Sequence, residues 1–69
     1  MPASNMTFGF TQLEIANRSG LHQSHISKYL NGKSMPTLMN IKKISDACNI
    51  PLSVVSEYLL DKYNDKKEG

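Results

Sequence analysis

Four polar side chains recur at helical spacing in a segment predicted to be helical from about His22 onwards. At about 3.6 residues per turn they lie on the outward face of that helix and carry one amide, two hydroxyls and one ammonium group. An amide can bond bidentately to adenine, and an ammonium group can donate to the acceptors of guanine in the major groove. We therefore predict that this face reads base edges in double-stranded DNA, through Gln23, Ser24, Ser27 and Lys28.

Residues 12–31, which must position these groups, have the pattern of two short helices joined by a tight turn. Thr11 can cap the first helix, and Glu14 completes a capping box. Gly20 can adopt the left-handed backbone that ends a helix, so the chain can turn sharply and begin the second helix. Helical spacing predicts the inward-facing residues of both helices to be Ile15, Ala16, Leu21, Ile26 and Tyr29.

The remainder of the chain predicts further helices and no strands, because its apolar residues recur at helical spacing without alternation. Thr37 can cap a helix that ends near Asn49, and Pro51, which is tolerated in a first turn, can begin another. The apolar residues of these two helices are, in order, Leu38, Ile41, Ile44 and Cys48, then Leu52, Val55, Leu59 and Tyr63.

The predicted fold is one all-α domain over residues 1–69, compact, with four to five helices and a polar, frayed tail at about residues 64–69. Pro2 and Gly9 restrict any helix before Phe10 to a turn or two, so a first helix there is expected to be short or irregular. In 69 residues we expect no separate ligand-sensing domain.

Residues 12–31 resemble the motif of the lambda-repressor-like helix-turn-helix family, the XRE-type regulators typified by phage Cro proteins and repressors. Ala16 falls at the motif's small position, Gly20 at its turn glycine and Ile26 at a buried position. The resemblance continues through the NGK at residues 31–33 and covers about residues 10–60. It implies a recognition helix that lies in the major groove of an operator, and the chain looks most like a Cro protein.

The resemblance also assigns roles to single residues. In that family a glutamine that opens the first motif helix braces a glutamine at the start of the recognition helix, and Gln12 and Gln23 hold those places. Base readout is thus expected from Gln12 as well. Contacts to the DNA backbone are predicted from Thr11, His22, Asn31, Lys33, Lys42 and Lys43. For His22 and His25, a role in binding and a plain exposed position are equally open.

Charge is distributed unevenly along the chain. Residues 1–43 contain five basic residues and one acidic residue, a net charge of +4, whereas residues 44–69 contain three basic and five acidic residues, a net charge of −2. These values agree with the overall charge of +2. A basic half that contains the motif suits a phosphate-facing surface, and an acidic half suits the side turned away from DNA.

Several functional classes are not supported by the residues present. The single Cys48 cannot form an internal disulfide, and two histidines without a Cys-x-x-Cys pair do not predict a metal site. We find no catalytic constellation and no phosphate-binding Gly-rich loop, so neither an enzyme nor a cofactor nor a small-molecule ligand is expected. No apolar run long enough for a membrane span and no signal peptide is present, so a cytoplasmic location is expected.

The last predicted helix has apolar residues beyond those that a single buried stripe would contain, namely Val54, Tyr58, Leu60 and Tyr63. These residues could form the seam of a homodimer on DNA, or the helix could simply wrap a small core. The function predicted is a sequence-specific transcriptional regulator, a Cro-like repressor that binds a palindromic operator as a dimer. The alternative is an antitoxin or anti-repressor that uses the same fold to bind a protein. The polar face of the recognition helix favours DNA, because protein-binding faces usually display Leu, Phe or Tyr.

Overall fold

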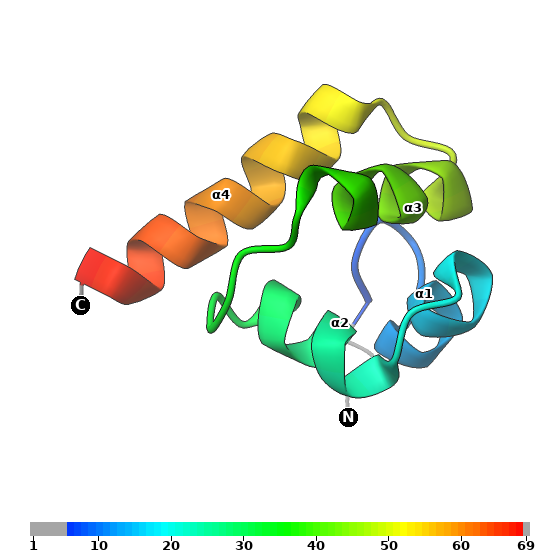
Figure 1. Cartoon of the computed structure of the whole chain (residues 1–69), viewed down its shortest axis with the longest axis horizontal. Helices are drawn as coiled ribbons and strands as arrows, with labels where there is room; N and C mark the ends of the chain where they lie inside the picture. The colour runs from blue at the N-terminus through cyan, green and yellow to red at the C-terminus, as the bar shows by residue number, and fades with distance from the viewer. Residues whose placement is uncertain (1–5, 69) are drawn as a thin grey trace.

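The computed structural model describes residues 6–68 and contains four helices within them (Figure 1). These are α1 (Gln12–Ser19), α2 (Gln23–Leu30), α3 (Leu38–Cys48) and α4 (Leu52–Glu68). In this part of the chain the only strand-like pairing is a single bridge between Thr7 and Phe10. The all-α prediction is confirmed, with four helices rather than five.

The helix ends follow from local chemistry that the sequence displays. The Thr11 hydroxyl accepts the backbone N–H of Glu14 at 3.2 Å, while the Glu14 carboxylate accepts the N–H of Thr11 at 2.9 Å. Gly20 ends α1 in the left-handed region, with φ of 78°. Thr37 caps α3 by accepting the N–H of Asn40 at 3.3 Å. The predicted capping box, the turn glycine and the cap at residue 37 are all confirmed.

A tight turn occupies the place of the expected first helix. The backbones of Thr7 and Phe10 exchange two hydrogen bonds, of 2.7 and 2.9 Å, around Phe8 and Gly9. Both central residues have positive φ, 57° and 87°, which is the geometry of a two-residue hairpin turn. Residues 6–10 therefore form no helix, and the part of that prediction that concerns residues 1–5 lies outside the described chain.

The core lies where all four helices meet, since α1 packs against α2 and α3, and α4 packs against α2 and α3. Five side chains are almost fully buried, and burying each contributes roughly 1.5–3 kcal/mol. They are Ile15, Ile26, Ile44, Val55 and Leu59. Phe8 and Phe10 of the N-terminal turn cover this core, and the Phe8 ring lies 5.0 Å from that of Tyr58. The turn thus supplies apolar cover that a further helix would otherwise give.

Cys48 is a buried core residue, as its position in the apolar stripe of α3 suggested. Burial raises the pKa of its thiol, and the neighbouring positive charge of Arg18 acts in the opposite direction. The guanidinium of Arg18 lies 4.4 Å from the centre of the Phe10 ring. The thiol therefore belongs to the packing of α3 against α1.

Three expectations are wrong at helix ends. Leu52 was expected on the buried stripe of the last helix but is 39% exposed, because it is the first residue of α4. Leu38 was expected in the core but is 69% exposed, because it is the first residue of α3 and points beyond the packed part of the helix. The fraying expected from Asn64 is not seen, since α4 continues as a helix to Glu68. In Figure 1 this C-terminal half of α4 projects past the other three helices.

Candidate nucleic-acid interface

The start of α1 offers two kinds of hydrogen-bonding group. The Thr11 hydroxyl is used as an acceptor in the capping box, but its own proton remains available to an acceptor such as a phosphate oxygen. The backbone N–H of Thr11, by contrast, already donates to the Glu14 carboxylate. A phosphate here would therefore meet the hydroxyl of Thr11 and the next N–H groups of the helix, with the negative charge of Glu14 nearby.

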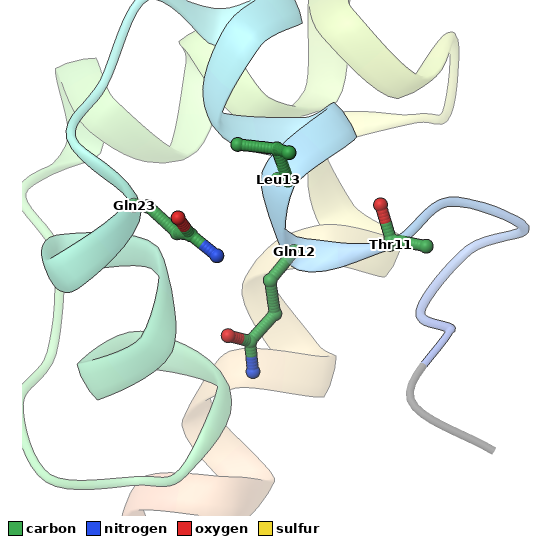
Figure 2. A pocket seen from close by; sticks show the side chains of 4 residues that line it. All are labelled: Thr11, Gln12, Leu13 and Gln23. Carbon is green, nitrogen blue, oxygen red and sulfur yellow. The ribbon is translucent and has the colours of Figure 1, made fainter. Parts of the chain in front are cut away.

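Gln12 and Gln23 line the same surface hollow, together with Thr11 and Leu13 (Figure 2). Figure 2 shows the Gln23 side chain extending from α2 toward the start of α1, where the Gln12 amide lies. Gln12 is half-buried and Gln23 is exposed. No hydrogen bond joins the two amides within the described chain, so both retain donors and acceptors for a ligand. The structure brings together the two glutamines that the sequence paired.

The outward face of α2 is polar. Its buried side is formed by Ile26, Tyr29 and Leu30. At about 100° per residue, Ser24 and Lys28 point directly away from that side, and Gln23 lies on the flank nearest α1. All three are exposed. Ser24 and Lys28 are therefore the central groups of the face, and Gln23 forms its edge.

Among the predicted base-reading residues, Ser27 is the one whose side chain already takes part in a hydrogen bond within the described chain. It is half-buried, and its hydroxyl accepts a hydrogen bond from the Asn31 side-chain amide at 3.3 Å. This bond closes the last turn of α2 and holds the Asn31 side chain against the helix. Within the free protein both residues support the end of α2.

Asn31, Gly32 and Lys33 end α2 in a Schellman motif. The N–H of Gly32 donates to the Tyr29 carbonyl at 3.2 Å, and the N–H of Lys33 donates to the Lys28 carbonyl at 2.9 Å. Gly32 has a φ of 74°, which a residue without Cβ adopts at little cost. These bonds fix the backbone of Lys33 just beyond α2, and its side chain is exposed, as is that of Asn31.

His22 is the N-cap residue of α2 and makes no side-chain capping hydrogen bond. Its ring lies 6.0 Å from that of His25, and the His25 ring lies 6.4 Å from that of Tyr29. Both histidines are exposed. The rings thus form a row along one flank of α2, on the side away from Gln23.

The two lysines of α3 occupy different faces of that helix. Lys42 lies 3.5 Å from the Asp46 carboxylate, in an exposed ion pair. Asn40, which contacts α2, is about 60° around the helix from Lys43 and about 160° from Lys42. Lys43 is therefore the better placed of the two to extend the basic surface of α2.

Leu13 lines the hollow as well, although the sequence did not predict it there. It is 52% exposed and lines the hollow beside Gln23. An exposed leucine next to amide groups resembles the apolar contacts that distinguish the thymine methyl group in the major groove. Its position off the apolar stripe of Ile15 and Ala16 was the signal that could have revealed it.

The described residues also bear on metal binding and on membrane spanning. Residues 6–68 contain no group of three or more His, Cys, Asp or Glu that could hold a metal ion. None of the helices in that range is both long and apolar enough to cross a membrane.

Comparison with known proteins agrees with this geometry. A helix-turn-helix family model matches residues 7–55, which is more than half of the chain and includes α1, α2 and α3. Neither a search of curated proteins nor a search of solved structures found a match. The matched family consists of DNA-binding transcriptional regulators. The chain therefore belongs to the XRE-type, lambda-repressor-like helix-turn-helix family.

Proposed function

We propose that this protein is a Cro-like repressor that recognises a specific double-stranded operator and acts in the cytoplasm by occupying a promoter. The observation that carries the proposal is the convergence of the Gln12 and Gln23 amides beside an exposed polar helix face. Neither amide is used by the fold, so both are free to pair with a base. An operator that overlaps a promoter would then be blocked by occupancy alone.

Each group on the α2 face has a role that suits its chemistry. Gln23 bonds an adenine through its carbonyl and amide groups, while Gln12 holds that amide in the plane of the base. Lys28, about one turn further along α2, donates to guanine acceptors. Ser24, at the centre of the face, bonds a base edge or a nearby phosphate, and Ser27 adds a weaker contact.

Contacts to the DNA backbone surround this face. Thr11 donates its free hydroxyl proton to a phosphate at the start of α1, and His22 serves the same strand at the start of α2. Asn31 and Lys33 grip the phosphates beyond the end of α2. On α3, Lys43 contributes most, and Lys42 contributes less because it is paired with Asp46. The net charge of +4 on residues 1–43 favours this orientation.

The test is selection of bound duplexes from a random pool at about 0.15 M salt, followed by Gln23→Ala. We expect Gln23→Ala to weaken binding to the selected site by about 1–3 kcal/mol and to leave binding to random duplex almost unchanged. Asn17→Ala is the matched control, because Asn17 is an exposed amide of α1 outside the hollow. An equal loss on both duplexes would reject base reading, and no enrichment at all would reject sequence-specific binding.

We further propose a two-fold homodimer on DNA, which would place two α2 helices about 34 Å apart on an inverted repeat. Around α4, Val54 and Tyr58 lie on one side of the buried stripe, and Leu60 and Tyr63 lie on the other. Val54 and Leu60 are the more available pair, at 45% and 44% exposure, since the Tyr58 ring already packs on Phe8. One flat partner surface cannot cover both sides, so the seam uses Val54 or Leu60 as its centre.

Sedimentation with and without operator tests the dimer and its seam. We expect one of the two variants Val54→Asp and Leu60→Asp to weaken dimer formation on DNA at least tenfold. The second variant, whose residue lies away from the centre of the seam, should have a smaller effect. Leu38→Asp is the control, because Leu38 is exposed at the start of α3. Loss of the dimer only with Leu38→Asp would move the seam to α3, and one protomer per operator would reject the dimer.

A further inference from the structure

The recognition helix α2 is held mainly by apolar packing. Ile26 and Leu30 are buried in the core, where α2 packs against α1 and α4. Dispersion and apolar burial have little directional preference, so such packing resists separation of helices more than it resists rotation about the helix axis. Base reading requires that α2 also resist rotation about its axis, because a hydrogen bond to a base edge weakens steeply when its direction changes.

One polar contact between α2 and α3 can constrain the rotation of α2. The Asn40 side-chain amide of α3 donates a hydrogen bond of 3.1 Å to the Tyr29 hydroxyl of α2. The two residues are eleven apart in the sequence, whereas every other side-chain hydrogen bond between residues 6 and 62 joins residues at most four apart. It is therefore the long-range polar link of this part of the chain.

Both ends of this link are well anchored. Tyr29 is only 8% exposed, so its ring is fixed by the core while its hydroxyl reaches α3. Asn40 lies in the first turn of α3, where its own N–H donates to the capping hydroxyl of Thr37. A hydrogen bond between two held groups constrains angle as well as distance.

We propose that Tyr29 and Asn40 are positioning residues that set the rotation of α2 and thereby determine how sharply it distinguishes one DNA sequence from another. Tyr29 lies one residue after Lys28, on the opposite side of α2 from Ser24. A turn of the helix about its axis therefore moves the tyrosine hydroxyl and the base-reading groups together. The proposal rests on the proposed function, because it assigns the origin of specificity at the same site.

The experiment compares wild type, Tyr29→Phe, Asn40→Ala and the double variant on the selected duplex and on a random duplex. Each single variant should lower the ratio of the two affinities by about fivefold, the size expected for one net hydrogen bond. The double variant should lower it no further, because both changes remove the same bond. Asn17→Ala is the matched control, since the Asn17 side chain is exposed and makes no hydrogen bond among the described residues.

Three results would overturn the proposal: an equal loss on both duplexes, additive effects in the double variant, or a loss equally large with Asn17→Ala. The dependence of binding on salt should stay the same in all variants, because no phosphate contact is removed. A changed salt slope would assign Tyr29 or Asn40 to phosphate binding, which also overturns the proposal.

A second measurement needs no DNA and separates this proposal from the proposed function. Residual dipolar couplings of the free protein report the orientation of α2 relative to α3. Tyr29→Phe should change that orientation or broaden its range, and Asn17→Ala should not. If wild type selects no duplex, the proposed function fails while these couplings still test the link. Unchanged couplings in Tyr29→Phe would overturn the positioning role.

Discussion

Helices α1 and α2 are both eight residues long and share one core, but they use their polar side chains differently. In α1, Thr11 and Glu14 bond to each other's backbone. The Ser19 hydroxyl donates to the Ala16 carbonyl and accepts the N–H of Leu21, which ties the turn to the helix. The polar side chains that flank the ends of α1 thus make hydrogen bonds within the fold, although the Thr11 hydroxyl keeps its own proton.

The corresponding polar groups of α2 make no such hydrogen bonds. His22 provides no side-chain cap, and Gln23, Ser24 and Lys28 make no side-chain hydrogen bond within the described chain. An eight-residue helix without a cap is unstable in isolation, so α2 depends on its packing against α1 and α4. The comparison shows that the first turn of α1 is capped by side chains, whereas the first turn of α2 is not, and that Gln23, Ser24 and Lys28 of α2 make no side-chain hydrogen bond in the described chain.

The largest effect on stability is expected from a substitution in the core that α1 and α2 share. Ile26→Ala deletes a fully buried side chain beneath α2 and should lower the free energy of unfolding by about 2–5 kcal/mol. Chemical denaturation measures this. Leu38→Ala is the control and should change stability by less than about 0.5 kcal/mol, since its side chain is 69% exposed. Equal losses would contradict the assignment of the core.

A smaller effect on stability should distinguish the polar side chains of α1, which the fold uses, from those of α2. Thr11→Ala removes the capping hydroxyl and should destabilise the protein by about 1 kcal/mol. Ser24→Ala should leave stability within about 0.5 kcal/mol, because the Ser24 hydroxyl makes no contact that the fold requires. Thermal unfolding of both variants tests the difference, and a larger loss for Ser24→Ala would refute it.

The smallest expected effect is an increase in stability. His22→Ser places a good N-cap residue at the start of α2 and should stabilise the protein by about 0.5–1 kcal/mol. Hydrogen exchange of the first amides of α2 should slow, while exchange in α1 stays the same. An unchanged exchange rate in α2 would mean that the uncapped end is already held by other contacts.

Helix ends could be predicted from the sequence because they depend on neighbouring residues. The caps at Thr11, Gly20 and Thr37 each act within one turn of the chain. Asn49 ends α3 in the left-handed region, with φ of 58°, as asparagine can. The convergence of Gln12 and Gln23 was also foreseen, from the resemblance of the motif to a known family.

Features that depend on distant parts of the chain could not be predicted in the same way. Periodicity placed Leu38 on the apolar stripe of α3, but only the packing of α3 reveals that this stripe's first residue has no neighbour to cover it. The bond between Tyr29 and Asn40 joins two helices across a loop, and neither residue carries a local signal of it. The polar composition after Asn64 predicted fraying, although charged residues continue a helix readily.

The end of α2 also bears on the chemical lifetime of the protein. Asparagine followed by glycine is prone to deamidation, in which the glycine nitrogen attacks the asparagine side-chain carbonyl, and Asn31 and Gly32 form such a pair. Here the Gly32 N–H is held by the Tyr29 carbonyl, and the Asn31 amide is held by Ser27. Both reactants are restrained, so folding slows an ageing reaction that would otherwise put a negative charge beside the basic groups at the end of α2.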